Sequence, residues 1–288
     1  MTFTTLIDAS ALRELAGKAD IVVIDCRFDL IQREGGRRAY LAGHIPGARY
    51  ADLNRDLSAP VSANSGRHPL PLPKDFAATL TKWGIGDATQ VIAYDDAGGS
   101  FAARAWWMLR WLGHTSVAVL DGGMKAWTVA GGTLESGAEQ PLPKAAPAGG
   151  RILAQANAAA VIDTANIAAF LSEPGNLLVD ARAAERYAGS VEPIDAVAGH
   201  IAGAVNHPFS ANLAPNGQFL PASELRRLWD ARLAGREVAH VAAMCGSGVT
   251  ACHNLLSLEV AGLPGAKLYA GSWSEWIKDP NRPIGRGA

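Results

Sequence analysis

The segment 244–253 contains the residues whose types and spacing could perform covalent chemistry. Cys245 ends a short apolar run and is followed at once by the sequence Gly-Ser-Gly, residues 246–248. A thiolate is a strong nucleophile, and glycines allow backbone conformations in which several amide N–H groups point at one atom. A helix that begins directly after the loop adds unpaired N–H groups and the positive end of its dipole. We therefore predict an amide cup, formed by the backbone N–H groups of residues 246–250, that stabilises an anionic sulfur on Cys245.

Other residues of this loop complete the predicted site. The hydroxyls of Ser247 and Thr250 are close enough in sequence to reach the sulfur of Cys245, which we expect to be the nucleophile. The loop residues that would bring backbone groups to the substrate are Gly246, Gly248 and Val249. The alternative for Cys245 is a buried structural thiol, because cysteine often behaves as a small apolar core residue. For Cys252 and Cys26 we expect that structural role.

Three other cysteine-based functions fit this segment poorly. A cysteine phosphatase needs an arginine at the sixth position after the nucleophile, and Ala251 stands there. A thioredoxin-like oxidoreductase needs a Cys-x-x-Cys pair, which the separation of Cys245 and Cys252 does not provide. Together with His253, these two cysteines also have the wrong spacing for a structural zinc site. We therefore expect no metal and no cofactor.

The elements that must position this loop occur twice along the chain. Residues 21–24 form an apolar run that ends at Asp25, and residues 177–179 form a second run that ends at Asp180. Short apolar runs of this kind are typical of strands buried in a parallel sheet. The chain therefore contains an internal duplication, offset by about 150 residues.

Matching turns and arginines follow these two strands. Residues 43–48 read Gly-His-Ile-Pro-Gly-Ala, and residues 199–204 read Gly-His-Ile-Ala-Gly-Ala. Arg27 and Arg182 follow the two matched aspartates by the same distance. Because these arginines are repeated, we expect each to pair with a nearby carboxylate in the scaffold.

A second pair of apolar runs ends at residues of different chemistry. The run 91–94 ends at Asp95, whereas the run 241–244 ends at Cys245. A Gly-rich loop follows each run. The two repeats therefore have the same order of elements, but at matching positions the first repeat has a carboxylate and the second has a thiol.

The alternation of strands and helices predicts the fold class. Helix-length segments follow each Gly-rich loop, over 101–112 and 249–260. We predict an α/β fold of two tandem domains, each a mainly parallel sheet flanked by helices. A Pro/Ala/Gly-rich stretch between the repeats has the composition of a linker. We expect the first domain over 1–138, the linker over 139–155 and the second domain over 156–288.

The composition is that of an ordinary globular chain. It has 288 residues, 49% of them hydrophobic, and a formal net charge of −1. No general basic field therefore exists to attract nucleic acid or an anionic membrane. No apolar run is long enough to span a bilayer, and the first residues lack the pattern of a secretory signal. Three cysteines are too few for a disulfide framework, which favours a cytoplasmic protein.

The sequence Cys-Gly-Ser-Gly-Val-Thr at 245–250 resembles the active-site loop of the rhodanese family, in particular its mercaptopyruvate sulfurtransferase version. The two repeats resemble the tandem rhodanese layout over nearly the whole chain. That layout has a catalytically silent first domain and a catalytic second domain. Asp95, at the position that matches Cys245, agrees with it. The resemblance therefore implies two tandem rhodanese-like domains and a sulfurtransferase.

The resemblance also implies ping-pong catalysis. The Cys245 thiolate takes the outer sulfur of a small anionic donor as a persulfide, and cyanide, a small thiol or a thioredoxin-like protein then accepts it. In the family, Ser247 would help to protonate the departing enolate and Thr250 would hydrogen-bond the sulfur. The substrate-binding arginine falls on Arg186, whose guanidinium suits an anion. His44 is a further substrate-binding candidate, because the family's first domain faces the active cleft; the alternative is a histidine that ties down its own turn.

Two features of the sequence indicate different donors. Mercaptopyruvate enzymes tend to carry a second arginine where this chain has Asp195, which resembles the thiosulfate enzymes. Thiosulfate enzymes usually carry basic residues directly after the cysteine, where this chain has Gly246 and Ser247. We give the loop more weight because it touches the reacting sulfur, and predict 3-mercaptopyruvate as the donor, with thiosulfate as the alternative. A persulfide carrier without turnover is a second alternative.

Overall fold

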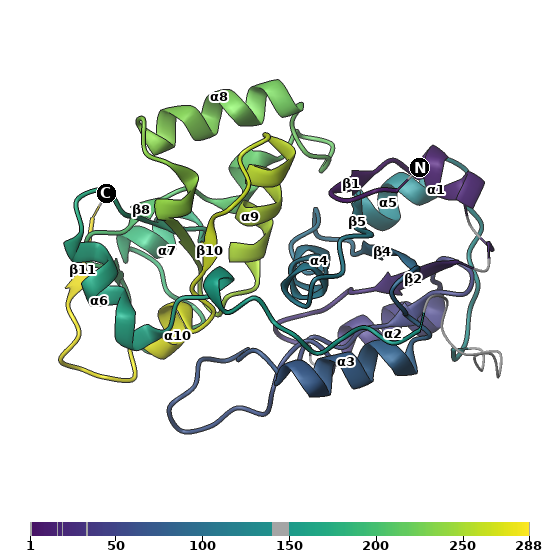
Figure 1. The fold of residues 1–288 in the computed structure, drawn as a ribbon, viewed down its shortest axis with the longest axis horizontal. Coiled ribbons are helices and arrows are strands. Elements are labelled where there is room, and N and C mark those ends of the chain that lie inside the picture. Colours follow the sequence, from purple (N-terminus) through teal and green to yellow (C-terminus); the bar gives the residue numbers. More distant parts are fainter. Residues whose placement is uncertain (1, 16, 19, 33, 140–149, 288) are drawn as a thin grey trace. The chain divides into compact units, whose positions relative to one another are not determined.

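The computed structural model describes residues 2–15, 17–18, 20–32, 34–139 and 150–287. The chain forms two compact units (Figure 1). Unit 1 contains Met1–Ala59, Pro71–Asn157 and Pro215–Phe219, and unit 2 contains Pro60–Leu70, Ala158–Ala214 and Leu220–Ala288. The segment Pro60–Leu70 therefore belongs to unit 2, although it comes from the first half of the sequence. Residues 140–149, most of the linker expected over 139–155, lie outside the described residues.

Unit 1 is built on a five-stranded sheet in the order β1-β5-β4-β2-β3, in which all neighbouring strands are parallel. The strands are β1 (Leu6–Ile7), β2 (Ile21–Asp25), β3 (Arg49–Tyr50), β4 (Gln90–Tyr94) and β5 (Val117–Leu120). The runs predicted as strands over 21–24 and 91–94 are β2 and β4, which pair residue by residue. Every residue of β4 is buried, as expected for a central parallel strand.

Helices pack against the sheet of unit 1 (Figure 1). They are α1 (Ala9–Leu15), α2 (Gly35–Ala42), α3 (Pro73–Lys82), α4 (Ala102–Trp111) and α5 (Gly123–Val129). Leu12, Tyr40 and Trp127 bring α1, α2 and α5 into one core cluster with Val23 and Ile92 of the sheet. The helix predicted over 101–112 is α4, which packs on β4 and β5.

Unit 2 repeats this plan with a four-stranded parallel sheet in the order β10-β9-β6-β8. The strands are β6 (Leu177–Asp180), β8 (Val205–Asn206), β9 (Val241–Met244) and β10 (Lys267–Leu268). A separate antiparallel pair joins β7 (His200–Ile201) to β11 (Ile284–Gly285). The strands predicted over 177–179 and 241–244 are β6 and β9, and they are neighbours.

The helices of unit 2 surround its sheet and fix its carboxyl edge. They are α6 (Thr164–Ser172), α7 (Ala184–Ala188), α8 (Ala222–Leu233), α9 (Thr250–Val260) and α10 (Ser272–Trp276), with 3-10 turns at Ala158–Ala160, Phe209–Asn212 and Val238–His240. The helix predicted over 249–260 is α9, which packs on β9 and β10. Among the described residues, none of the helices combines the length and the apolar character that a bilayer crossing requires.

Each unit contains the same buried arginine–aspartate arrangement at the end of its first matched strand. Arg27 binds the Asp25 carboxylate through Nε and Nη2, and its Nη2 also donates to the Gly43 carbonyl at 2.8 Å. Arg182 binds Asp180 in the same way and donates to the Gly199 carbonyl at 2.8 Å. The expected scaffold pairing of both arginines is confirmed. In each unit the pair ties the strand end to the Gly-His turn.

Candidate active site

Cys245 lies directly after β9, at the carboxyl edge of the unit 2 sheet. Its backbone N–H donates to Ser272 Oγ at 3.1 Å, and its carbonyl accepts from the Trp273 N–H at 3.0 Å. Both partners belong to α10, so that helix holds the cysteine in place. The residue is only 2% exposed, so its side chain is almost completely shielded from solvent. Fixed dipoles act strongly on a charge in such a dry environment.

The loop that follows the cysteine leaves backbone amides without protein partners. In the part of the chain that the structure describes, the N–H groups of Ser247, Val249 and Thr250 have no protein acceptor. Gly248 has a φ of +77°, and a Cβ there would lie 2.4 Å from the Ala270 carbonyl oxygen. Only glycine allows this path of the loop. The donors of the predicted amide cup are therefore available to a bound anion.

Unit 1 shows what the matching loop holds, because Asp95 takes the place of the cysteine there. The two carboxylate oxygens of Asp95 accept hydrogen bonds from four backbone N–H groups of the loop and the start of α4. These donors, at 2.8–2.9 Å, are Ala97, Gly99, Phe101 and Ala102. Such a loop therefore surrounds and stabilises a buried anion. In unit 1 the anion is the chain's own side chain, at the position where unit 2 has Cys245.

Two guanidinium groups face the loop beside Cys245. A Cβ added to Gly246 would lie 2.9 Å from Nη2 of Arg67 and 3.7 Å from Nη1 and Nη2 of Arg186. Arg186 comes from α7, and Arg67 comes from the segment Pro60–Leu70. Arg186, the substrate-binding candidate, therefore lies at the loop, together with a second arginine that the sequence analysis missed. The glycine at 246 leaves the space that both side chains use.

Two carboxylates partner these arginines. Arg186 Nη2 donates to Glu192 Oε1 at 2.8 Å and to Asp195 Oδ2 at 3.1 Å, and Asp195 Oδ1 forms a close ion pair with Arg67. Burial by itself raises the pKa of the Glu192 carboxyl, but hydrogen bonds from Arg186 and two backbone amides outweigh it and lower that pKa. Burial dominates at Asp195 and raises its pKa despite the attraction of Arg67.

Ser247 has a histidine partner that the sequence analysis also missed. His68 Nδ1 lies 2.8 Å from Ser247 Oγ, and both residues are buried. The backbone next to His68 is fixed to α10, because the Arg67 N–H donates to Ser274 Oγ at 3.1 Å. A histidine hydrogen-bonded to a hydroxyl can pass a proton through it. The one feature of the sequence that could have indicated this partner is the adjacent pair Arg67-His68, within a segment rich in Pro, Ser and Gly.

The comparison with known families covers both halves of the chain. The rhodanese-like domain matches twice, over residues 8–130 and 163–279. The chain belongs to the rhodanese family. The predicted tandem arrangement is confirmed, with unit 1 as the first rhodanese copy and unit 2 as the second.

Individual rhodanese relatives match over the full length. A probable 3-mercaptopyruvate sulfurtransferase of Pseudomonas aeruginosa is 49% identical over 289 residues, covering 100% of both chains. A putative thiosulfate sulfurtransferase of Mycobacterium tuberculosis is 40% identical, over 98% of this chain and 97% of the relative. The solved structure of 3-mercaptopyruvate sulfurtransferase from Leishmania major matches with a TM-score of 0.82 and 31% identity, over 95% of this chain and 74% of that one.

The first rhodanese copy contains His44. Its Nδ1 lies 2.8 Å from the Tyr40 carbonyl oxygen, its ring stacks on the Tyr40 ring at 3.9 Å, and its Nε2 lies 3.8 Å from Glu135. His200 of the second copy repeats the arrangement on Tyr187, with 2.8 Å to the carbonyl and 3.8 Å between the rings. These local contacts support the structural alternative, so we leave His44 out of the proposed site.

The other cysteines are buried in their own surroundings. Cys252 lies within α9, and its Sγ is 3.4 Å from the Gly248 carbonyl oxygen. Cys26 lies at the end of β2, where burial and the nearby Asp25 carboxylate raise the pKa of its thiol. Both positions agree with the expected packing role. Thr250 is the first residue of α9, at the end of the loop that follows Cys245.

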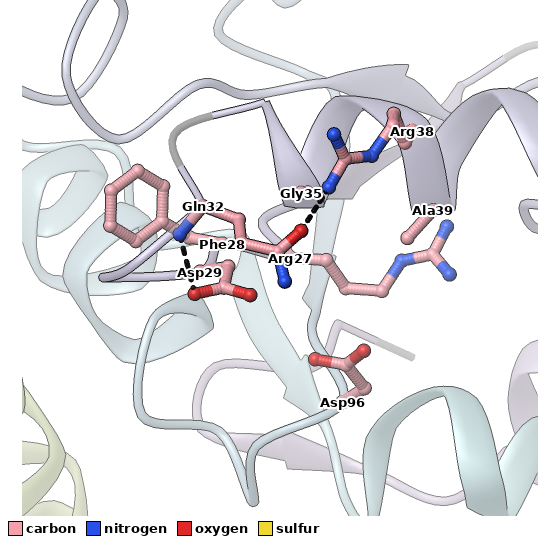
Figure 2. Close-up of a pocket in the computed structure, with 9 residues that line it drawn as sticks. Arg27, Phe28, Asp29, Gln32, Gly35, Arg38, Ala39 and Asp96 are labelled. Carbon is pink, nitrogen blue, oxygen red and sulfur yellow. Dashed lines mark hydrogen bonds between the residues drawn. The ribbon is translucent and has the colours of Figure 1, made fainter.

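The first rhodanese copy also has a pocket of about 500 Å³ at its own sheet edge, which Figure 2 shows. Arg38 lines this pocket and donates to Gln32 Oε1. Ala39 precedes Tyr40 just as Arg186 precedes Tyr187 in the second copy. At the positions that match Cys245 and Arg186, the first copy therefore has Asp95 and Ala39.

Proposed function

We propose that the chain is a sulfurtransferase that moves sulfane sulfur from 3-mercaptopyruvate to an acceptor through a persulfide on Cys245. The acceptor would be cyanide, a small thiol or a thioredoxin-like protein. The hydrogen bond between His68 and Ser247, beside a cysteine in an amide cup, carries this proposal. Relatives named as mercaptopyruvate and thiosulfate sulfurtransferases support the reaction class.

The first step transfers one sulfur atom to the enzyme. The Cys245 thiolate attacks the donor sulfur, a new S–S bond forms, and the C–S bond of mercaptopyruvate breaks. The electron pair of that bond passes to the carbon, which leaves the enolate of pyruvate. The amides of Ser247, Val249 and Thr250 stabilise the anionic sulfur before and after the transfer.

The departing enolate needs a proton, and Ser247 can supply it. Ser247 Oγ lies on the loop next to the attacking sulfur, and His68 can return a proton to it through their 2.8 Å contact. Thiosulfate makes no such demand, because sulfite leaves with the S–S electron pair and needs no proton. A buried histidine–serine pair is therefore more useful for mercaptopyruvate than for thiosulfate.

Arg186 and Arg67 are the proposed anion clamp for the donor. Both guanidinium groups face Gly246, within reach of a carboxylate whose sulfur points at Cys245. A guanidinium presents paired N–H donors that match a carboxylate. The clamp would orient the donor so that its sulfur, rather than its carbonyl carbon, meets the thiolate.

The second step returns the enzyme to its resting form. The nucleophilic acceptor attacks the outer persulfide sulfur, the S–S bond breaks, and the electron pair returns to Cys245 as a thiolate in the amide cup. All three cysteines are free thiols in the structure. We propose a cytoplasmic setting, because a reducing compartment preserves a free catalytic thiol.

The experiment that tests the donor uses Ser247→Ala and His68→Gln. Both variants should lower kcat/KM for 3-mercaptopyruvate about 100-fold, the usual size of a lost general acid, and should change kcat/KM for thiosulfate only a few-fold. His240→Gln is the matched control, because His240 is exposed and contacts Asn176. Equal losses with both donors would reject the assignment to mercaptopyruvate.

The alternative of a carrier without turnover makes a different prediction. A carrier takes up one sulfur from the donor and then stops, whereas the proposed enzyme reaches a steady state with excess donor and acceptor. Multiple turnovers that vanish in Cys245→Ser support the enzyme. A single round of labelling in the unmodified chain would support the carrier.

A further inference from the structure

Asp195 occupies a position between the two arginines of the clamp. Its Oδ2 lies 3.1 Å from Arg186 Nη2, and its Oδ1 pairs with Arg67 Nη1. The Asp195 side chain is only 4% exposed, so solvent screens these interactions weakly. The negative charge of this carboxylate therefore makes the electrostatic potential at the donor site beside Gly246 less positive.

The charges around the clamp cancel. Arg67 and Arg186 contribute two positive charges, and Glu192 and Asp195 contribute two negative charges. Arg182 also lies 3.4 Å from Glu192, but it is paired with Asp180, so this second pair leaves the sum of charges unchanged. The loop residues Gly246 and Ser247 carry no charge. The donor thus meets two well-oriented guanidinium groups but little net positive charge.

We propose that Asp195 is a specificity-determining residue that selects monoanionic donors and disfavours dianionic ones. The inference rests on the proposed function, since it concerns the donor of the same Cys245 reaction. A monoanion such as 3-mercaptopyruvate gains hydrogen bonds from the clamp and meets repulsion on one charge only. A dianion such as thiosulfate meets the repulsion of Asp195 on both of its charges, without surplus positive charge to offset it.

The contacts of Asp195 indicate a donor preference different from the one that the sequence alone indicates. By family resemblance an acidic residue here indicates a thiosulfate enzyme, but those enzymes carry basic residues directly after the cysteine. This chain has Gly246 there, so the acid acts without that compensation. The raised pKa of Asp195 fits this picture, since it reports a carboxylate whose charge is costly where it lies.

The test compares kcat/KM for thiosulfate and for 3-mercaptopyruvate, with cyanide as the common acceptor, in the unmodified protein and in Asp195→Asn. The variant should raise the ratio of the thiosulfate value to the mercaptopyruvate value about tenfold, as expected for one partly screened charge. Raising the salt concentration should shrink that difference. Asp195→Glu, which keeps the charge, should retain the original preference.

Asp230→Asn is the matched control, because Asp230 forms an exposed ion pair with Arg226 on α8 and contacts neither arginine of the clamp. It should leave the donor ratio unchanged. A second measurement needs no variant: pyruvate, a monoanion, should inhibit the unmodified protein at lower concentration than sulfate, a dianion. This comparison still tests the proposal if Asp195→Asn does not fold.

Two outcomes would overturn the inference. An unchanged donor ratio in Asp195→Asn, with equal losses for both donors, would mean that Asp195 only positions Arg67. Stronger inhibition by sulfate than by pyruvate would mean that the site favours dianions. Failure of the proposed function looks different, because the unmodified protein would then gain no sulfur on Cys245 from either donor, as read by intact-mass analysis.

Discussion

Arg186 and Arg67 reach the same point beside Cys245 from distant parts of the sequence. Arg186 stands in α7, close to the Asp180 strand end, whereas Arg67 stands in Pro60–Leu70. Both side chains are partly exposed, so each can turn from its carboxylate partner to an incoming anion. Two guanidinium groups fix the orientation of a small donor better than one guanidinium group does.

We expect Arg186→Ala to lower kcat/KM for the donor about 10- to 100-fold, because a hydrogen bond to a charged group contributes about 1.5–3 kcal/mol. The loss should lie mainly in KM, since the thiolate and its amides are untouched. Arg186→Lys should recover only part of it, because an ammonium cannot form the paired contact. Steady-state kinetics checks this, with the exposed Arg226→Ala as control. Unchanged kinetics for every donor would remove Arg186 from the site.

The residues of the catalytic loop could be predicted, whereas their partners could not. The types and order of Cys245, Ser247 and Thr250 are local, and a strand end before a Gly-rich loop limits what they can do. Arg67 and His68 are about 180 residues away in sequence. Their place beside the loop depends on the tertiary packing of Pro60–Leu70 on α10, which no local pattern encodes.

At the scale of elements, α9 begins in the catalytic loop and is held from behind by a buried polar network. Trp229 Nε1 donates to Ser257 Oγ at 2.8 Å, and Ser257 Oγ donates to Asn212 Oδ1 at 2.9 Å. Asn212 Nδ2 donates to Asn254 Oδ1 at 2.8 Å, and Asn212 Oδ1 also lies 2.9 Å from His207 Nε2. The network joins α8, α9 and the 3-10 turn before α8, so it fixes the direction in which α9 points at the cysteine.

We expect Asn212→Ala to lower the free energy of unfolding by about 3 kcal/mol or more, because it leaves several buried polar groups without partners. Asn212 is 0% exposed, so water cannot replace the lost bonds. Equilibrium urea unfolding followed by circular dichroism measures the change. Asn281→Ala, at an exposed asparagine that contacts Asp279, should change stability by less than about 0.5 kcal/mol. Equal stability of the two variants would show that the network contributes little.

The central strands and the helices that follow the Gly-rich loops were predictable, and the shortest elements were not. The strands β2, β4, β6 and β9 are apolar runs bounded by polar or glycine-rich residues, and α4 and α9 begin after such loops. The pair β7–β11 has only two residues on each side and joins residues 200–201 to 284–285. A two-residue strand carries no periodicity, so only the folded contact defines it.

At the scale of the whole molecule, the two rhodanese copies share one scaffold and differ at the site. The Arg–Asp pair, the Tyr–His stack and the order of the central strands recur in both units. Among the described residues, the second copy combines a thiol with unpartnered loop amides, whereas Asp95 accepts hydrogen bonds from the matching amides in the first copy. The duplication therefore predicts one reactive centre in each chain rather than two.

We expect intact-mass analysis after treatment with excess donor to find one added sulfur atom for each chain. Cys26 and Cys252 should stay unmodified, because both are buried and neither lies in the amide cup. The raised pKa of Cys26 also keeps that thiol protonated and therefore unreactive. Cys245→Ser should abolish the added mass, whereas Cys26→Ser should retain it. Two added sulfur atoms on the folded chain, or labelling that survives Cys245→Ser, would contradict this prediction. Either result would mean that a nucleophile other than Cys245 accepts sulfur, and Asp95 of the first copy cannot be that nucleophile.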